Sequence, residues 1–438
     1  MRLLQPLGCA LLAAALSGGA AFAQVAPPAA GQQVRARADA AVKAMNEGRF
    51  DDAAASYRTL LKTFPNNPDL LSDLASAQSL GGHPADAVAT LRTLTRIAPK
   101  RPHGWYVLGH AYNDLAQDAI ATFNDRAEDV PWRQLLLADA LTTDGRLTDA
   151  FALYRTALEA LPSMTAIHEW IARIYEQSGH PDWAAQERAA LPSAAECAKA
   201  KPAFFCDFRA ERYRSVLDSA AGRSEPDARY WQARAAVELA KAAFKQLDAL
   251  PDSRERREMR ATMSRSERRY TDAILELQAA LKFAPGDPDL LHDLGTTYFF
   301  AKDYEKAVAT LLPLVKTHAD DPQLLATCGS ALLQLQRIDE AIPLLQRSAA
   351  LDTSDPAVRL ALAQAFIAKE YFAAAIPLLE LDLSDDTDGS LHVQLARAYK
   401  GLGNAEKTTA LLARSQELQK AAQERNAAKG QRTITPPK

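Results

Sequence analysis

The chain has 438 residues, of which 48% are hydrophobic and 24% are charged, so it can bury a large core and wholesale disorder is excluded. Its 51 Lys and Arg nearly balance its 54 Asp and Glu, which leaves a formal charge of −3. No strong basic field exists to attract nucleic acid or an anionic membrane surface, so nucleic acid is not expected as a partner.

The first 23 residues are typical of a signal peptide. Arg2 supplies a positive start, residues 7–15 an apolar stretch, and residues 21–23 a small-x-small cleavage motif. Cys9 follows Leu7-Gly8 as in a lipoprotein site, but lipid attachment there would leave almost no apolar stretch. No stretch reaches the roughly 18–20 residues of a membrane span. We expect cleavage after Ala23 and a periplasmic or secreted protein without a transmembrane segment.

After a flexible Ala/Pro-rich linker at residues 24–33, a pattern repeats in steps of 34 residues. Repeats begin at Val34, Pro68 and Pro102, then at Pro131 and Thr165, then at Arg254, Pro288, Pro322 and Pro356, and one residue late at Gly389. The eighth position of each is small: Ala41, Ala75, Gly109, Ala138, Ala172, Ala261, Gly295, Gly329, Ala363 and Ala396. Small residues at a fixed site let two helices of a hairpin touch. Pro at the first position suits the first turn of a helix.

Two sequence signatures identify the kind of repeat. A first-helix pattern W-x2-L-G-x2-Y occurs as Trp105, Leu108, Gly109 and Tyr112. A second-helix pattern A-x3-F with a closing Pro occurs as Ala53, Tyr57 and Pro65, and again as Ala150, Tyr154 and Pro162. These motifs resemble those of the tetratricopeptide-repeat family. The resemblance implies an all-α, right-handed superhelical solenoid of about ten or more helix hairpins.

The period breaks in two places, which defines the expected organisation. Residues 34–192 form an N-terminal array, in which the repeat at Pro102 has a shortened or irregular second helix around residues 119–129. Residues 193–253 fit no single repeat and are expected to form divergent helical hairpins. Residues 254–425 form a C-terminal array with a capping helix, and residues 426–438 a disordered tail. Residues 254–270 are Arg-rich, either as an anion-binding edge or as a solvated helix face with ion pairs.

Three cysteines remain after the signal peptide. On one continuous helix, Cys197 and Cys206 would be roughly 13 Å apart, too far for a disulfide. Pro202 interrupts that helix, so a Cys197–Cys206 disulfide is expected in an oxidising compartment. Cys328, next to a close-packing Gly, is expected to be a buried apolar residue.

No catalytic, metal-binding or cofactor-binding motif stands out, so neither an enzyme nor a cofactor is expected. The family resemblance implies binding through a concave groove lined by the first helix of each repeat. The groove candidates are Tyr106, His110, Asn113, Asp114, Asp139, Glu169, Arg173, His292, Thr296, Phe299, Phe300, Gln364 and Arg397.

The sequence therefore predicts a non-catalytic scaffold that binds another envelope protein or a peptide. Two alternatives stay open. One is a helper of polysaccharide export or assembly that contacts glycan. The other is an enzyme whose site lies in the irregular 193–270 region.

Overall fold

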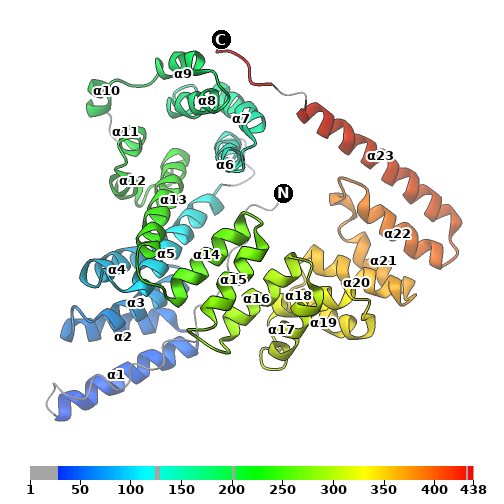
Figure 1. Cartoon of the computed structure of the whole chain (residues 1–438), viewed down its shortest axis with the longest axis horizontal. Helices are drawn as coiled ribbons and strands as arrows, with labels where there is room; N and C mark the ends of the chain where they lie inside the picture. Colours follow the sequence, from blue (N-terminus) through cyan, green and yellow to red (C-terminus); the bar gives the residue numbers. More distant parts are fainter. Residues whose placement is uncertain (1–27, 124–128, 200–202, 431–432, 438) are drawn as a thin grey trace. The chain divides into compact units, whose positions relative to one another are not determined.

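The computed structural model describes residues 28–123, 129–199, 203–430 and 433–437, and these residues form helices without any strand. The all-α prediction is confirmed. The predicted signal peptide lies outside the described residues. The chain forms two compact units, which are described separately (Figure 1). Unit 1 contains the residues up to Pro251 together with the segment 433–437, and unit 2 contains the residues from Asp252 to Gly430.

Unit 1 contains thirteen described helices. They are α1 (Pro28–Asn46), α2 (Phe50–Thr63), α3 (Pro68–Leu80), α4 (Pro84–Ile97), α5 (Pro102–Ala121), α6 (Val130–Thr143), α7 (Leu147–Ala160), α8 (Ala166–Gln177), α9 (Pro181–Arg188), α10 (Ala194–Lys199), α11 (Phe204–Arg209), α12 (Tyr213–Ala220) and α13 (Pro226–Asp248). Helix α1 begins inside the segment 24–33, for which a flexible linker was expected.

Unit 2 is a regular run of hairpins. Its helices are α14 (Arg254–Ser266), α15 (Tyr270–Ala280), α16 (Pro288–Phe300), α17 (Tyr304–Val315), α18 (Pro322–Gln334), α19 (Ile338–Leu351), α20 (Pro356–Ala368), α21 (Phe372–Glu380), α22 (Ser390–Gly401) and α23 (Ala405–Gly430). Helix α23 continues to Gly430, where a disordered tail was expected from residue 426, because its residues keep an unbroken helical backbone beyond the last hairpin.

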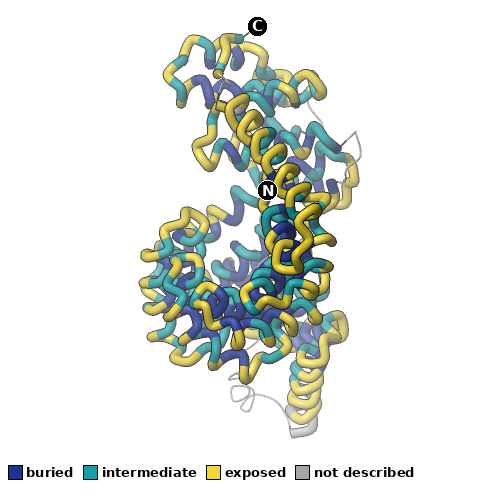
Figure 2. Tube along the Cα trace, turned by 90° about the vertical axis from the view of Figure 1, so that its right-hand side faces the viewer, coloured by how far each residue is buried: buried dark blue, intermediate teal, exposed yellow. Residues whose placement is uncertain are grey.

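Local sequence explains where the helices begin. The carboxylates of Asp287, Asp321 and Asp355 and the amide oxygen of Asn67 accept hydrogen bonds from backbone N–H groups in the first turn of the helix that follows. Each such cap satisfies donors that have no partner inside the helix. Figure 2 shows stretches of buried and exposed residues alternating along the helices, as expected for helices that bury one face.

The turn inside each hairpin contains one residue with a positive φ. These residues follow the 34-residue period, and they are Gly48, Gly82, Gly145, Gly179, Arg268, Lys302, Gln336, Glu370 and Gly403. They lie at the fifteenth position of nine of the ten repeats. In the repeat that begins at Pro102, the fifteenth residue is Ala116, which lies inside α5. That repeat therefore has no turn at the usual place.

The second helix of this repeat is supplied from more than a hundred residues later in the sequence, by α13. A Cβ atom added to Gly109 of α5 would lie 2.3 Å from Cε1 of Phe244 in α13. In unit 2, a Cβ on Gly295 would lie 2.4 Å from Leu311 of the adjacent second helix. Phe244 thus occupies the position that Leu311 occupies in an ordinary hairpin. Figure 1 shows α5 and α13 side by side.

Of the short second helix expected around residues 119–129, residues 119–121 instead belong to α5, and residues 124–128 lie outside the described residues. Helix α5 continues to Ala121, and the helices α6–α12 are inserted between the two halves of one repeat. The sequence contained a signal for this arrangement. Ala240 and Phe244 have the A-x3-F spacing of a second helix, and Pro251 follows one residue earlier than in the other repeats.

The region 193–253 contains one further hairpin, α11–α12, whose turn residue Glu211 has the same positive φ. Cys197 lies in α10 and forms a disulfide with Cys206 of α11, and the two Cα atoms are 5.5 Å apart. This is the pair expected from the sequence. Cys328 is buried in the unit 2 core, and burial raises the pKa of its thiol to about 11.

Thiol counting tests this arrangement. On the chain that begins at Gln24, Ellman's reagent is expected to detect no thiol under native conditions, because Cys328 is buried and protonated. After denaturation without reductant it is expected to detect one thiol per chain, and three after reduction. Three thiols before reduction would show that Cys197 and Cys206 are not bonded.

Candidate binding sites

The groove candidates of unit 2 lie on three of its first helices, α16, α20 and α22. Helices α16, α18, α20 and α22 contact one another in order. His292, Thr296 and Gln364 are half-buried, and Arg397 is exposed. The Thr296 hydroxyl is buried and has no hydrogen-bond partner among the described residues. The imidazole, amide and guanidinium groups of these residues can bind polar ligands of several kinds.

Phe299 and Phe300 have different environments. Phe299 packs against the unit 2 core, with its ring centroid 5.7 Å from that of Tyr304. Phe300 is 54% exposed and stacks against Tyr270 at 6.1 Å. Two adjacent aromatic residues on a helix cannot point into the same core, since successive side chains are turned by about 100°. Phe300 is therefore the member of the pair that is available to a partner.

The groove candidates on α5 are partly engaged inside unit 1. The rings of Tyr106 and His110 are 4.5 Å apart, and the His110 ring lies 5.4 Å from Phe244 of α13. Asn113 is half-buried, and Asp114 is exposed. Tyr106 and His110 thus help to pack α13 onto α5, in addition to any role in binding.

Asp139 of α6 lies in an internal polar network. Its carboxylate pairs with the Arg234 guanidinium of α13 and accepts a hydrogen bond of 2.5 Å from the Tyr154 hydroxyl. The Arg234 guanidinium also lies 4.0 Å from the centre of the Trp170 ring. Although burial opposes it, the charge of Asp139 raises the pKa of Arg234. Burial and the charge of Asp139 raise the pKa of Tyr154. This network joins α6, α7, α8 and α13 and engages the Asp139 carboxylate inside unit 1.

Glu169 and Arg173 of α8 are likewise bonded to each other, with 2.9 Å between Nε and Oε1. Glu169 is buried and also pairs with Arg188 of α9 at 3.1 Å. Arg173 is half exposed and lies 5.1 Å from the Trp170 ring. Asp139, Glu169 and Arg173 are therefore each paired within unit 1, and Arg173 and the Asp139 partner Arg234 both lie over the Trp170 ring.

The Arg-rich segment 254–270 is neutralised by carboxylates. Arg257 pairs with Asp252 and Glu276, and Arg265 pairs with Asp293 at 2.7 Å. Arg269 pairs with Glu267 and Asp272. Of the two interpretations offered by the sequence, the solvated face with ion pairs agrees with these contacts.

Unit 1 holds an extended segment of the chain at a seat that the sequence did not predict. The Tyr175 hydroxyl donates a hydrogen bond of 2.6 Å to the carbonyl oxygen of Thr435. The ring of Tyr175 lies 5.5 Å from Phe151 of α7 and 5.5 Å from Trp183 of α9, and Ile434 packs against the same apolar cluster. The segment 433–437, expected to be disordered, is thus held by one hydrogen bond and one apolar anchor.

Two other features of the described residues bear on function. No three His, Cys, Asp or Glu side chains among them are grouped as metal ligands. No helix in the described part of the chain has both the length and the apolarity that crossing a membrane requires.

Comparison with known proteins shows similarity to a curated protein. The cellulose synthase operon protein C of Pseudomonas fluorescens (strain SBW25) is 30% identical over 130 residues, which are 27% of this chain and 10% of that protein. The chain thus matches only a tenth of the relative's length. Among solved structures, MamA is 20% identical over 39% of this chain and 98% of MamA, with a TM-score of 0.36. YrrB, a tetratricopeptide-repeat protein with an unusual peptide-binding site, is 18% identical over 40% of this chain and 92% of YrrB, with a TM-score of 0.36.

Models of the tetratricopeptide-repeat family match residues 44–110, 264–329 and 327–386, which fall in both units. The matched regions contain helix hairpins with the 34-residue period described above. The chain therefore belongs to the tetratricopeptide-repeat family.

Proposed function

We propose that this protein is a non-catalytic scaffold of the bacterial cell envelope that binds an extended peptide segment of a partner protein. The observation that carries the proposal is the hydrogen bond from Tyr175 to the carbonyl of Thr435, next to the apolar anchor Ile434. A repeat array that holds one extended segment in this way has the chemistry to hold another. In unit 2, exposed Phe300 and the first-helix residues near it are a second candidate surface for such a segment.

The seat suits a segment with an apolar residue followed by Thr and Pro. Pro436 has no N–H and restricts Thr435 to extended backbone, so the segment loses little conformational freedom on binding. The bond accepted by the Thr435 carbonyl does not depend on its side chain, while Ile434 gives the apolar contact. Burial raises the pKa of Tyr175, which keeps its hydroxyl protonated as the donor.

Location outside the cytoplasm is part of the proposal. The first 23 residues have the composition of a signal peptide. The Cys197–Cys206 disulfide is the kind of bond that persists in oxidising compartments such as the periplasm. Both features support export.

A labelled synthetic peptide of residues 431–438 tests the proposed binding. Fluorescence anisotropy is expected to show that it binds a chain ending at Gly430 about tenfold or more tightly than the full chain, in which the seat is occupied. Tyr175→Phe removes only the donor, so it is expected to weaken binding by about five- to tenfold. The same change at exposed Tyr371 serves as the control and is expected to have no effect.

A peptide with Ile434→Asp is expected not to bind, because a charge would enter an apolar seat. Equal binding of this peptide and the unchanged one would overturn the proposal, as would no binding to the shortened chain. Glycan handling is the second candidate, favoured by the curated relative from a cellulose synthase operon. Cello-oligosaccharides that bind the shortened chain when the peptide does not would favour that function instead.

A further inference from the structure

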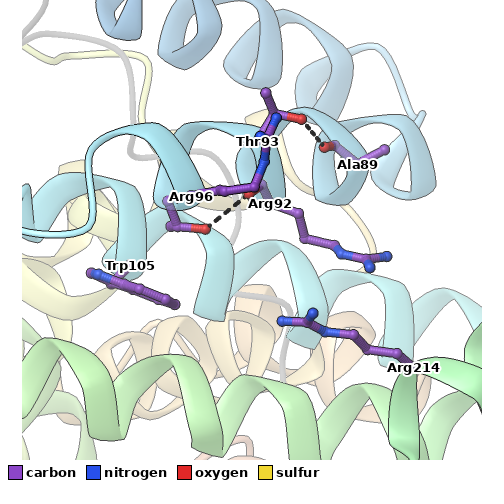
Figure 3. Close-up of a pocket in the computed structure, with 7 residues that line it drawn as sticks. Ala89, Arg92, Thr93, Arg96, Trp105 and Arg214 are labelled. Carbon is purple, nitrogen blue, oxygen red and sulfur yellow. Dashed lines mark hydrogen bonds between the residues drawn. The ribbon is translucent and has the colours of Figure 1, made fainter.

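A pocket of about 420 Å³ lies in unit 1 between α4, α5 and α12 (Figure 3). Arg92 and Arg96 reach it from α4, Arg214 from α12 and Trp105 from α5. Figure 3 shows the guanidinium groups of Arg92 and Arg214 extending toward each other from their two helices. A volume in this range accommodates a small molecule.

The lining of this pocket carries positive charge without a matching carboxylate. No Asp or Glu among the described residues lines the pocket. The guanidinium groups of Arg92, Arg96 and Arg214 make no hydrogen bond or ion pair to another described residue, in contrast to the paired arginines of α14. Burial raises the pKa of the neighbouring Tyr112, the charges of Arg92 and Arg214 lower it, and the charge of Asp218, one turn after Arg214 on α12, raises it. One carboxylate near three guanidinium groups leaves a net positive site.

The other polar groups of the pocket are already satisfied. The Thr93 hydroxyl donates to the carbonyl oxygen of Ala89 at 3.3 Å, and the Thr95 hydroxyl to that of Leu91 at 3.0 Å. The indole N–H of Trp105 donates to the carbonyl oxygen of Pro99 at 2.8 Å. The arginines therefore remain as the groups that can bind a ligand, and Trp105 offers only its apolar ring.

We propose that this pocket binds a saccharide that carries a carboxylate or a phosphate group. The planar guanidinium fork binds carboxylate and phosphate oxygens in pairs, and an anion relieves the repulsion among Arg92, Arg96 and Arg214. The ring of Trp105 gives an apolar wall on which the C–H face of a sugar ring can pack, as aromatic walls do in small-molecule sites. The pocket is built by α12, which belongs to the inserted helices, so it exists only because the repeat is split.

Titration calorimetry on the full chain at low salt tests the proposal with four probes: glucuronate, glucose 6-phosphate, glucose and inorganic phosphate. Glucuronate or glucose 6-phosphate is expected to bind. The probe that binds more tightly shows whether the pocket prefers a carboxylate or a phosphate group. Arg92→Gln and Arg214→Gln are each expected to weaken binding by about tenfold. Arg37→Gln on α1 makes the same change of charge outside the pocket and is expected to leave binding unchanged. Raising the salt concentration is expected to weaken binding.

Trp105→Leu separates the two parts of the proposal. This variant is expected to weaken the binding of glucuronate and glucose 6-phosphate while leaving the weak binding of inorganic phosphate unchanged. Equal affinity for inorganic phosphate and glucose 6-phosphate would overturn the assignment to a saccharide. Absence of binding by all charged probes, or binding that is insensitive to Arg92→Gln and Arg214→Gln, would overturn the site itself. The proposed peptide binding is independent of these outcomes, because its seat at Tyr175 shares no residue with the pocket.

Discussion

Arg234→Met is expected to lower the free energy of unfolding of unit 1 by about 3–5 kcal/mol, the largest effect of any single change considered. The variant leaves the Asp139 carboxylate largely buried without its cation, and also removes the contact with the Trp170 ring. Removing one member of a buried ion pair lowers the free energy of unfolding by more than the intact pair adds to it, because the remaining buried charge has no partner. Urea denaturation followed by circular dichroism measures the shift of the unfolding midpoint.

Arg173→Met is the matched control for this experiment. Arg173 also lies over Trp170, but it is half exposed and its ion pair is screened by solvent. Its loss is expected to cost less than about 1 kcal/mol. The double variant Asp139→Leu with Arg234→Met is expected to recover part of the loss, since no buried charge remains. Equal effects of Arg173→Met and Arg234→Met would show that the network is no more than a surface pair.

Gly109→Ala is expected to destabilise unit 1 by about 1–3 kcal/mol, although Ala favours a helix over Gly by roughly 1 kcal/mol. The new Cβ would lie 2.3 Å from the Phe244 ring, so α5 and α13 would have to separate or the ring would have to move. The midpoint of thermal or urea unfolding measures the effect. It tests directly whether α13 is the second helix of this repeat.

Gly104→Ala in the same helix is the matched control. Its Cβ would meet Leu94 at 3.4 Å, an ordinary contact, so it is expected to be neutral or to stabilise the unit by up to about 1 kcal/mol. Combining Gly109→Ala with Phe244→Leu is expected to cost less than the sum of the two changes, because a smaller side chain makes room for the Cβ. Additive effects would contradict the close approach of α5 and α13.

Much of the fold could be predicted from the sequence because the residues that define each repeat lie close together in the chain. Small residues at the eighth position, Pro at the first and Asp or Asn before it each act within one hairpin, so the start of each repeat was visible without the structure. The position of Gly109 showed that a helix must approach α5 closely. Which helix approaches it could not be found by counting in steps of 34, because α13 lies outside that register.

The candidate sites were harder to predict for the same reason. Carrying the family's groove positions over to this chain requires that the inner face of each first helix stays open. In unit 1, however, Arg234 and Phe244 of α13 contact Asp139 and His110. The Arg-rich segment 254–270 was conspicuous in the sequence yet is paired with carboxylates from neighbouring helices. The unpaired arginines, by contrast, come from α4 and α12, more than a hundred residues apart in the sequence. Which arginines are paired with carboxylates in the folded protein cannot be predicted from the order of residues in the sequence.

The split repeat has a consequence for the order in which the chain acquires its structure. An ordinary hairpin closes over a turn of a few residues, whereas α5 must wait for α13 across roughly a hundred residues, which adds about 3 kcal/mol of loop-closure entropy. During synthesis, the face of α5 that packs against α13 stays uncovered until α13 has emerged, and α6–α12 can pack among themselves in the meantime. Unit 1 is therefore expected to fold from the inserted helices outward, with the joining of α5 and α13 as its last and slowest step.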